Sequence, residues 1–171
     1  MKRRLFVMIL CCFLTVIFSE LLAEPIDPVD PHERCAVCGM MVAKYNPWIT
    51  QIHAEGEKPA MFDGVKDMMA YYFNPQAYGG KGNMSTAVLW VKDYYTLTWL
   101  NGRAAFFVVG SDVMGPMGEE LVPFDSLKAA ENFLKDHKGT KVLRFEDLDA
   151  EMIMAMKKKH MMKMKKKGMK K

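Results

Sequence analysis

Two stretches of the chain repeat one pattern at an offset of 62 residues. Residues 61–73 read MFDGVKDMMAYYF, and residues 123–134 read PFDSLKAAENFL. Each contains Phe-Asp-x-aliphatic-Lys followed by apolar residues at helical spacing, which is typical of a short strand leading into a helix. Phe62 and Phe124 take equivalent places in the two copies. Either the chain carries two related units, or two unrelated strand–turn–helix segments match by chance.

Strands expected around the two predicted helices complete a pair of β-β-α-β modules. Alternating and continuous apolar runs predict these strands within residues 46–56, 57–64, 86–94, 104–112, 115–124 and 141–148. One module would occupy residues 35–93, and the other would occupy residues 94–150. Because a module of this size is too small to bury its own sheet face, we expect the two to pack together as one α+β domain.

Several polar and aromatic residues have structural roles in this scheme. Asp63 is expected to cap the first helix, and Asp125 or Ser126 the second, because their side-chain oxygens can accept hydrogen bonds from free N–H groups at a helix start. The inward face of the second helix is predicted to carry Leu127, Ala130, Phe133 and Leu134. The core is predicted to include the three tryptophans, Trp48, Trp90 and Trp99.

The N-terminus, residues 1–23, has the features of a signal peptide. The basic segment MKRR precedes the apolar run LFVMILCCFLTVIF, and the small residue Ala23 suits a cleavage site. Cys11 and Cys12 lie in this run, but the preceding MIL is a poor lipid-attachment box, so we expect cleavage; an uncleaved or lipidated anchor is the alternative. A linker, residues 24–34, follows. The mature chain would be periplasmic and would keep two cysteines.

Charge is unevenly distributed along the chain. The net charge is +4, of which residues 151–171 carry +8 and residues 1–23 carry +2, so residues 24–150 carry −6. An acidic body argues against nucleic-acid binding. The Met/Lys-rich tail, residues 151–171, is expected to be disordered or loosely helical. Its seven methionines and His160 could hold Cu(I) loosely, its lysines could meet anionic lipid or an acidic partner, or it could be a solvated tail without a role.

The segment ERCAVCGMMV, residues 33–42, admits three chemistries. A redox dithiol sits at a helix N-terminus in thioredoxin-like enzymes, but Gly39 after the second thiol favours a tight loop instead. Structural zinc needs four ligands, and neither a second Cys pair nor a His pair accompanies this one. Cu(I) accepts two or three soft donors, and Cys35, Cys38 and Met40 supply a set within one loop.

A second exposed thioether is expected in the turn Pro116-Met117-Gly118. Proline fixes one side of this turn and glycine loosens the other, which would present the Met117 sulfur outward. Core filling is the alternative for Met40 and Met117, because methionine packs adaptably, and it is the preferred role for Met41.

The segments CAVCGMMV, FDGVKDMMAYY and GSDVMGPMGEELVPFDSLKAAENFLKDHKGTKVLRFEDL together resemble the NosL family. These are exported accessory proteins for nitrous oxide reductase. The resemblance implies two β-β-α-β modules and a Cu(I) carrier for the copper–sulfide cluster of the reductase. It assigns the copper ligands Cys38 and Met40 from the CGM block and Met117 from the PMG block, with Cys35 as a paired thiol. The Met/Lys-rich tail and the poor lipid-attachment box depart from the family pattern.

The expected function is therefore that of a periplasmic Cu(I)-binding chaperone, not an enzyme. Its partners would be the copper ion and nitrous oxide reductase or the membrane-bound assembly machinery of that enzyme, with possible membrane association and no nucleic acid. A thiol–disulfide oxidoreductase, a structural protein and a copper carrier for a cytochrome oxidase are the alternatives.

Overall fold

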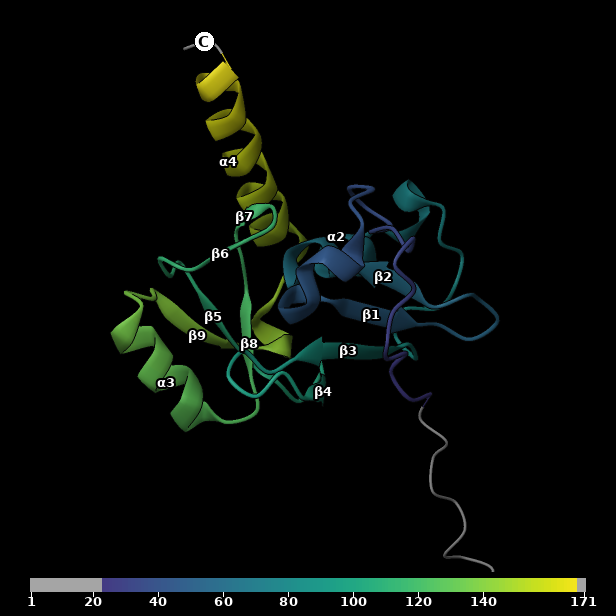
Figure 1. The fold of residues 1–171 in the computed structure, drawn as a ribbon, viewed down its shortest axis with the longest axis horizontal. Helices are drawn as coiled ribbons and strands as arrows, with labels where there is room; N and C mark the ends of the chain where they lie inside the picture. Colours follow the sequence, from purple (N-terminus) through teal and green to yellow (C-terminus); the bar gives the residue numbers. More distant parts are fainter. Residues whose placement is uncertain (1–22, 169–171) are drawn as a thin grey trace, which may run out of the picture.

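A computed structural model describes residues 23–168, and the predicted signal peptide therefore lies almost wholly outside the described residues. The N-terminal half forms a four-stranded antiparallel sheet in the order β2-β1-β3-β4 (Figure 1). Its strands are β1 (Thr50–His53), β2 (Ala60–Phe62), β3 (Val88–Lys92) and β4 (Trp99–Asn101). β4 belongs to this sheet, although it lies beyond residue 93, the expected end of the first module.

A second antiparallel sheet has the order β8-β5-β9. Its strands are β5 (Phe106–Val109), β8 (Val122–Phe124) and β9 (Lys141–Arg144). The connection from β5 to β8 carries a small hairpin of β6 (Met114–Gly115) and β7 (Gly118–Glu119). The two sheets share one topology in their first three strands. In each sheet the strand that precedes the helix pairs with one edge of the first strand, and the strand that follows the helix pairs with its other edge. The predicted α+β fold class is confirmed.

The two helices between these strands start 62 residues apart, in line with the sequence repeat. They are α2 (Val65–Phe73) and α3 (Leu127–Asp136). Phe62 and Phe124, at the ends of β2 and β8, are both fully buried. The repeated pattern therefore marks equivalent strand–helix turns.

The helix starts nevertheless differ between the copies. Ser126 caps α3, its hydroxyl accepting a hydrogen bond from the Ala129 N–H at 3.3 Å. The N-cap residue of α2 is Gly64, which has no side chain, and the free Lys66 N–H of the first turn donates instead to the buried carboxylate of Glu120 at 2.6 Å. The expected capping role of Asp63 is wrong, because the hydrogen bond that its carboxylate accepts comes from a cysteine thiol.

The core lies between the two sheets and extends under α3. Along β5, Phe107 belongs to the central core that both halves share, and Val108 belongs to the smaller core beneath α3. Alternation of side chains along a strand thus lets one sheet pack on both faces. Ala130 and Phe133 are buried under α3 as expected, but Leu127, in the first turn of the helix, is 46% exposed.

Short 3-10 helices connect the regular elements. They are η1 (Val42–Trp48), η2 (Pro75–Tyr78) and η3 (Phe145–Asp147). η1 replaces the start of the strand expected from residue 46, so β1 begins only at Thr50. The expected burial of the tryptophans is only partial: Trp90 Nε1 donates to the Ala23 carbonyl and Trp99 Nε1 to Asp27, each at 2.8 Å.

The C-terminal tail forms a regular helix, α4 (Ala150–Gly168). It packs against α2, and its C-terminal part extends away from both sheets (Figure 1). The tail was expected to be disordered or loosely helical; it is helical, and its first turns pack into the fold, because Ile153 is fully buried and Met156 is nearly so. Within residues 23–168, no helix has both the length and the apolar character needed to cross a bilayer.

Candidate metal centre

The thiol segment folds into a tight loop closed by backbone hydrogen bonds. Arg34 and Met41 form an isolated antiparallel bridge, and the Cys35 N–H donates to the Met40 carbonyl at 2.8 Å. The Gly39 N–H donates back to the Cys35 carbonyl at 2.9 Å. Gly39 has a φ of +76°, a conformation that favours glycine. The sequence prediction of a tight loop rather than a helix start is confirmed here.

Four potential ligand groups converge where this loop meets the start of α2. The thiols of Cys35 and Cys38 and the carboxylates of Asp63 and Asp67 offer ligand atoms that all lie within 4.8 Å of one another. The Cys38 thiol donates to Asp63 Oδ1 at 3.3 Å, and the Cys35 thiol approaches Asp67 Oδ2 at 3.6 Å. The two aspartates stand four residues apart, so they lie on one side of the helix start.

Sequence reasoning missed both carboxylates. Asp63 was expected to act only as a helix cap, and Asp67 was given no role. Their spacing of four residues at a helix start was the available signal, but nothing local to α2 indicates that the thiol loop packs against it. The contact joins Cys35 to a residue 32 positions later in the chain.

Burial controls the protonation of the two thiols. It raises the pKa of Cys35 far above its ordinary value, and the neighbouring Asp63 carboxylate raises it further. Burial also raises the pKa of Cys38, to about 11, although a hydrogen bond from the Met40 backbone opposes this. Both thiols are therefore protonated at neutral pH in the metal-free protein. A nucleophilic redox dithiol requires the opposite shift, so the site is poorly suited to thiol–disulfide exchange.

The cluster fits a bound cation. Asp63 Oδ2 is buried and has no hydrogen-bond partner among the described residues, which is costly for a carboxylate oxygen unless a cation or another donor satisfies it. A cation would also displace the thiol protons and offset the gathered negative charge. Zinc was disfavoured from the sequence because too few ligands were identified. The two carboxylates complete a set of four, so the number of ligands alone does not determine which metal binds. The sulfur pair favours a soft ion.

An open cavity leads to this cluster. Cys38, Asp67 and Met117 line it, together with Val37, Lys66, Lys157, His160 and Met161. Met117 comes from the tip of the β6-β7 hairpin, which Lys66 fixes by donating from Nζ to the Met117 carbonyl at 2.8 Å and to the Glu119 carbonyl. Cys38 is thus the thiol that reaches the cavity, whereas Cys35 is 3% exposed and lies behind it.

The four residues predicted as copper ligands occupy different places around the site. Cys35 and Cys38 belong to the cluster, and Met117 shares the cavity wall with Cys38. Met40 lies on the returning arm of the loop, half-buried, and is not among the residues that line the cavity. Its ligand role remains a prediction.

The fold and the cluster define a class of protein: a small α+β protein with a candidate thiol–carboxylate metal site that one half-buried cysteine connects to a cavity. Residues 25–153 match the family model for NosL, and the chain belongs to that family.

One curated protein and two solved structures are similar to this chain. The copper-binding lipoprotein NosL of Stutzerimonas stutzeri is 27% identical over 142 residues, covering 77% of this chain and 70% of the relative. The crystal structure of the copper chaperone NosL from Shewanella denitrificans is similar with a TM-score of 0.60 and 25% identity, over 73% of this chain and 96% of that one. The solution structure of apo-NosL from Achromobacter cycloclastes is 31% identical, with a TM-score of 0.46, over 61% of this chain and 87% of that one.

Proposed function

We propose that this protein is a periplasmic copper chaperone that binds Cu(I) at the thiol–carboxylate centre and delivers it for maturation of the copper–sulfide site of nitrous oxide reductase. The observation that carries the proposal is the convergence of Cys35, Cys38, Asp63 and Asp67 beside a cavity that Met117 also lines. The names of the relatives support copper as the cargo. The protein would act as a carrier and not as an enzyme.

The geometry suits ligand exchange. The protons of Cys35 and Cys38 leave when the thiolates bind Cu(I), and the neighbouring carboxylates are placed to accept them. Met117 adds a thioether that needs no deprotonation. Met40 is the remaining proposed ligand. Because Cys38 faces the cavity, a ligand from an acceptor protein can attack the ion on that side without any change in its oxidation state.

Copper binding is tested by titrating the reduced protein with Cu(I) in competition with a chelator. We expect one tight equivalent that Cys38→Ser abolishes, because this change removes the accessible thiolate. Met41→Leu is the matched control, since Met41 neighbours the loop but does not line the cavity. X-ray absorption should show sulfur around the bound copper. A spectrum with only nitrogen and oxygen neighbours, or displacement of the copper by equimolar zinc, would contradict the proposal.

Delivery is a separate step with its own test. Cells that lack the chaperone would be complemented with the wild-type protein or with Cys38→Ser, and the copper content of purified nitrous oxide reductase would be measured. We expect the copper–sulfide site of the reductase to be fully occupied only in cells that are complemented with the wild-type protein. Normal occupancy with Cys38→Ser, or a deficit confined to a cytochrome oxidase, would direct the assignment to another acceptor.

A further inference from the structure

The C-terminal helix turns one continuous face toward the metal centre. Ile153, Met156, Lys157, His160 and Met161 follow one another at spacings of three or four residues, which places them on one side of α4. The first two of these residues are buried in the central core. The last three line the cavity that contains Cys38 and Met117. The helix is thus anchored at its start and faces the centre one to two turns later.

Two ion pairs fix α4 in this position. Lys157 Nζ lies 3.2 Å from Asp67 Oδ1, and the Asp67 side chain is only 3% exposed. Lys159 Nζ lies 2.7 Å from Glu119 on β7. One pair therefore joins the helix to the thiol–carboxylate cluster, and the other joins it to the hairpin that carries Met117. Both pairs also offset the lysine charge that would otherwise repel a cation.

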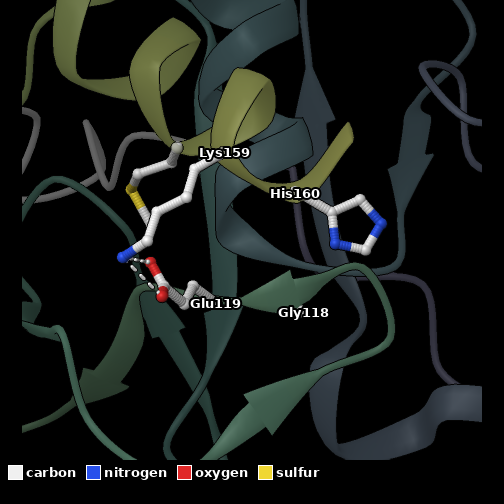
Figure 2. A pocket seen from close by; sticks show the side chains of 5 residues that line it. Gly118, Glu119, Lys159 and His160 are labelled. Atoms are coloured by element: carbon white, nitrogen blue, oxygen red, sulfur yellow. Dashed lines mark hydrogen bonds and ion pairs between the residues drawn. The ribbon is translucent and has the colours of Figure 1, made fainter. Parts of the chain in front are cut away.

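His160 is held against the hairpin itself. A Cβ atom placed on Gly118 would lie 2.6 Å from His160 Nδ1, so this contact requires glycine. Figure 2 shows the His160 ring extending from α4 over the hairpin beside Gly118, while Lys159 extends in another direction to Glu119. Gly118 directly follows Met117 in the chain. The imidazole is therefore positioned next to the thioether-bearing turn.

We propose that α4 carries a second copper-binding station, formed by His160 and Met161 together with Met117, at the mouth of the cavity that leads to the thiol–carboxylate centre. This inference rests on the proposed function for the identity of its cargo. One imidazole nitrogen and two thioether sulfurs suit Cu(I), which accepts two or three soft or borderline ligands. Met161 is 56% exposed, so the station faces solvent and a docking partner.

The two stations differ in charge and therefore in strength. The inner centre binds through anionic thiolates, whereas the outer station uses neutral donors that hold Cu(I) more weakly. Met117 lines the same cavity as Cys38 and Met161, and it can bind the ion while the other ligands are exchanged. Copper would thus move between the centre and a partner through the outer station, without release into water.

The test uses the full chain and the double variant His160→Ala/Met161→Leu. Wild-type protein is expected to bind two equivalents of Cu(I), the second about tenfold or more weakly than the first. The double variant should lose the second equivalent and keep the first. Met154→Leu on the same helix is the matched control, because Met154 is exposed and does not line the cavity.

Spectroscopy separates this station from loose binding by other tail methionines. In the second step of the titration, the methyl carbons of Met117 and Met161 and the ring of His160 should shift together in NMR spectra. Cys35→Ser/Cys38→Ser should lose the first step and keep the second, so failure of the inner centre is distinguishable from failure of the outer one. Two unchanged equivalents in the double variant, or His160 signals that do not respond to copper, would overturn the station. Absence of any bound copper in the wild type would overturn both sites.

Discussion

Asp63 lies beside both thiols, with Oδ1 accepting the Cys38 hydrogen bond at 3.3 Å and Oδ2 buried without a partner among the described residues. Its negative charge raises the pKa of Cys35 and of Cys38, in each case adding to the larger effect of burial. Burial and this carboxylate together favour the protonated thiols, which slows their oxidation because the thiolate is the reactive form.

Replacement of Asp63 by asparagine should make the metal-free thiols more reactive. Without the negative charge the pKa of Cys38 falls, and each unit of that fall increases the thiolate fraction at neutral pH about tenfold. We expect several-fold faster alkylation of Cys38 by iodoacetamide at pH 7.5. The control is Asp125→Asn, because Asp125 is the equivalent residue in the second copy and is exposed. Equal rates in the wild type and Asp63→Asn would show that burial alone sets the pKa of this thiol.

The raised thiol pKa values also predict an alkaline loss of stability. The pKa of Cys38 rises from 9.0 to about 11 on folding, so the stabilisation is fully present below pH 9 and is lost as the pH rises through 11. Urea unfolding of the reduced, metal-free protein should give a free energy of unfolding that falls between these pH values. The double variant Cys35→Ser/Cys38→Ser should show a smaller fall, since only other groups titrate. Identical pH profiles for both proteins would contradict the assigned cause.

At the scale of elements, the hairpin β6-β7 and α4 depend on each other. His160 of α4 lies against Gly118, where φ is +82° and no space remains for a Cβ atom. The hairpin is also joined to α2 through Lys66. Local sequence therefore predicts the turn at Met117, but the position of the turn is set by two helices that lie far apart in the chain.

Gly118→Ala should separate these elements. The added methyl group meets both an unfavourable backbone conformation and the His160 ring, and we expect a loss of about 1–3 kcal/mol of stability. Gly56→Ala is the matched control, because Gly56 has a similar φ of +74° but open space around its Cβ position. Unfolding in urea measures the difference between the two variants. NMR signals of the His160 ring should move in Gly118→Ala alone; unmoved signals would mean that the ring does not rest on the hairpin.

Sequence patterns identified the elements whose signals are local. The strand–helix turns at Phe62 and Phe124 follow from apolar periodicity and are confirmed by the structure. The role of Asp67 in the thiol cluster and the packing of Ile153 were missed, because both depend on contacts between distant segments. Lys157, for example, pairs with Asp67 across 90 residues. The composition of the Met/Lys-rich tail suggests an unstructured segment. The tail nevertheless forms a regular helix, and two residues near its start are buried.

At the scale of the whole molecule, the two sheets are parts of one core. Phe107 on β5 is fully buried in the cluster that also contains Ile52 and Leu89 of the first sheet and Ile153 of α4. The candidate metal centre lies along this junction: the first half supplies the thiols and carboxylates, the second half supplies Met117, and α4 forms one wall of the open cavity. The geometry of the site is therefore tied to the packing of both halves.

This arrangement predicts a single cooperative unfolding transition. Phe107→Ala should lower the free energy of unfolding by about 3–5 kcal/mol, because it leaves a cavity where the two sheets meet. Leu127→Ala is the control, since Leu127 is 46% exposed on α3 and should change stability little. Far-UV circular dichroism follows the whole backbone, whereas tryptophan fluorescence follows the surroundings of the three tryptophans. Trp90 and Trp99 lie in the first sheet, and Trp48 packs against the core beneath α3. Both signals should shift to the same lower midpoint in Phe107→Ala. Separate midpoints would mean that the halves fold independently, and the first half would then keep its thiol cluster while Met117 and α4 came away from it.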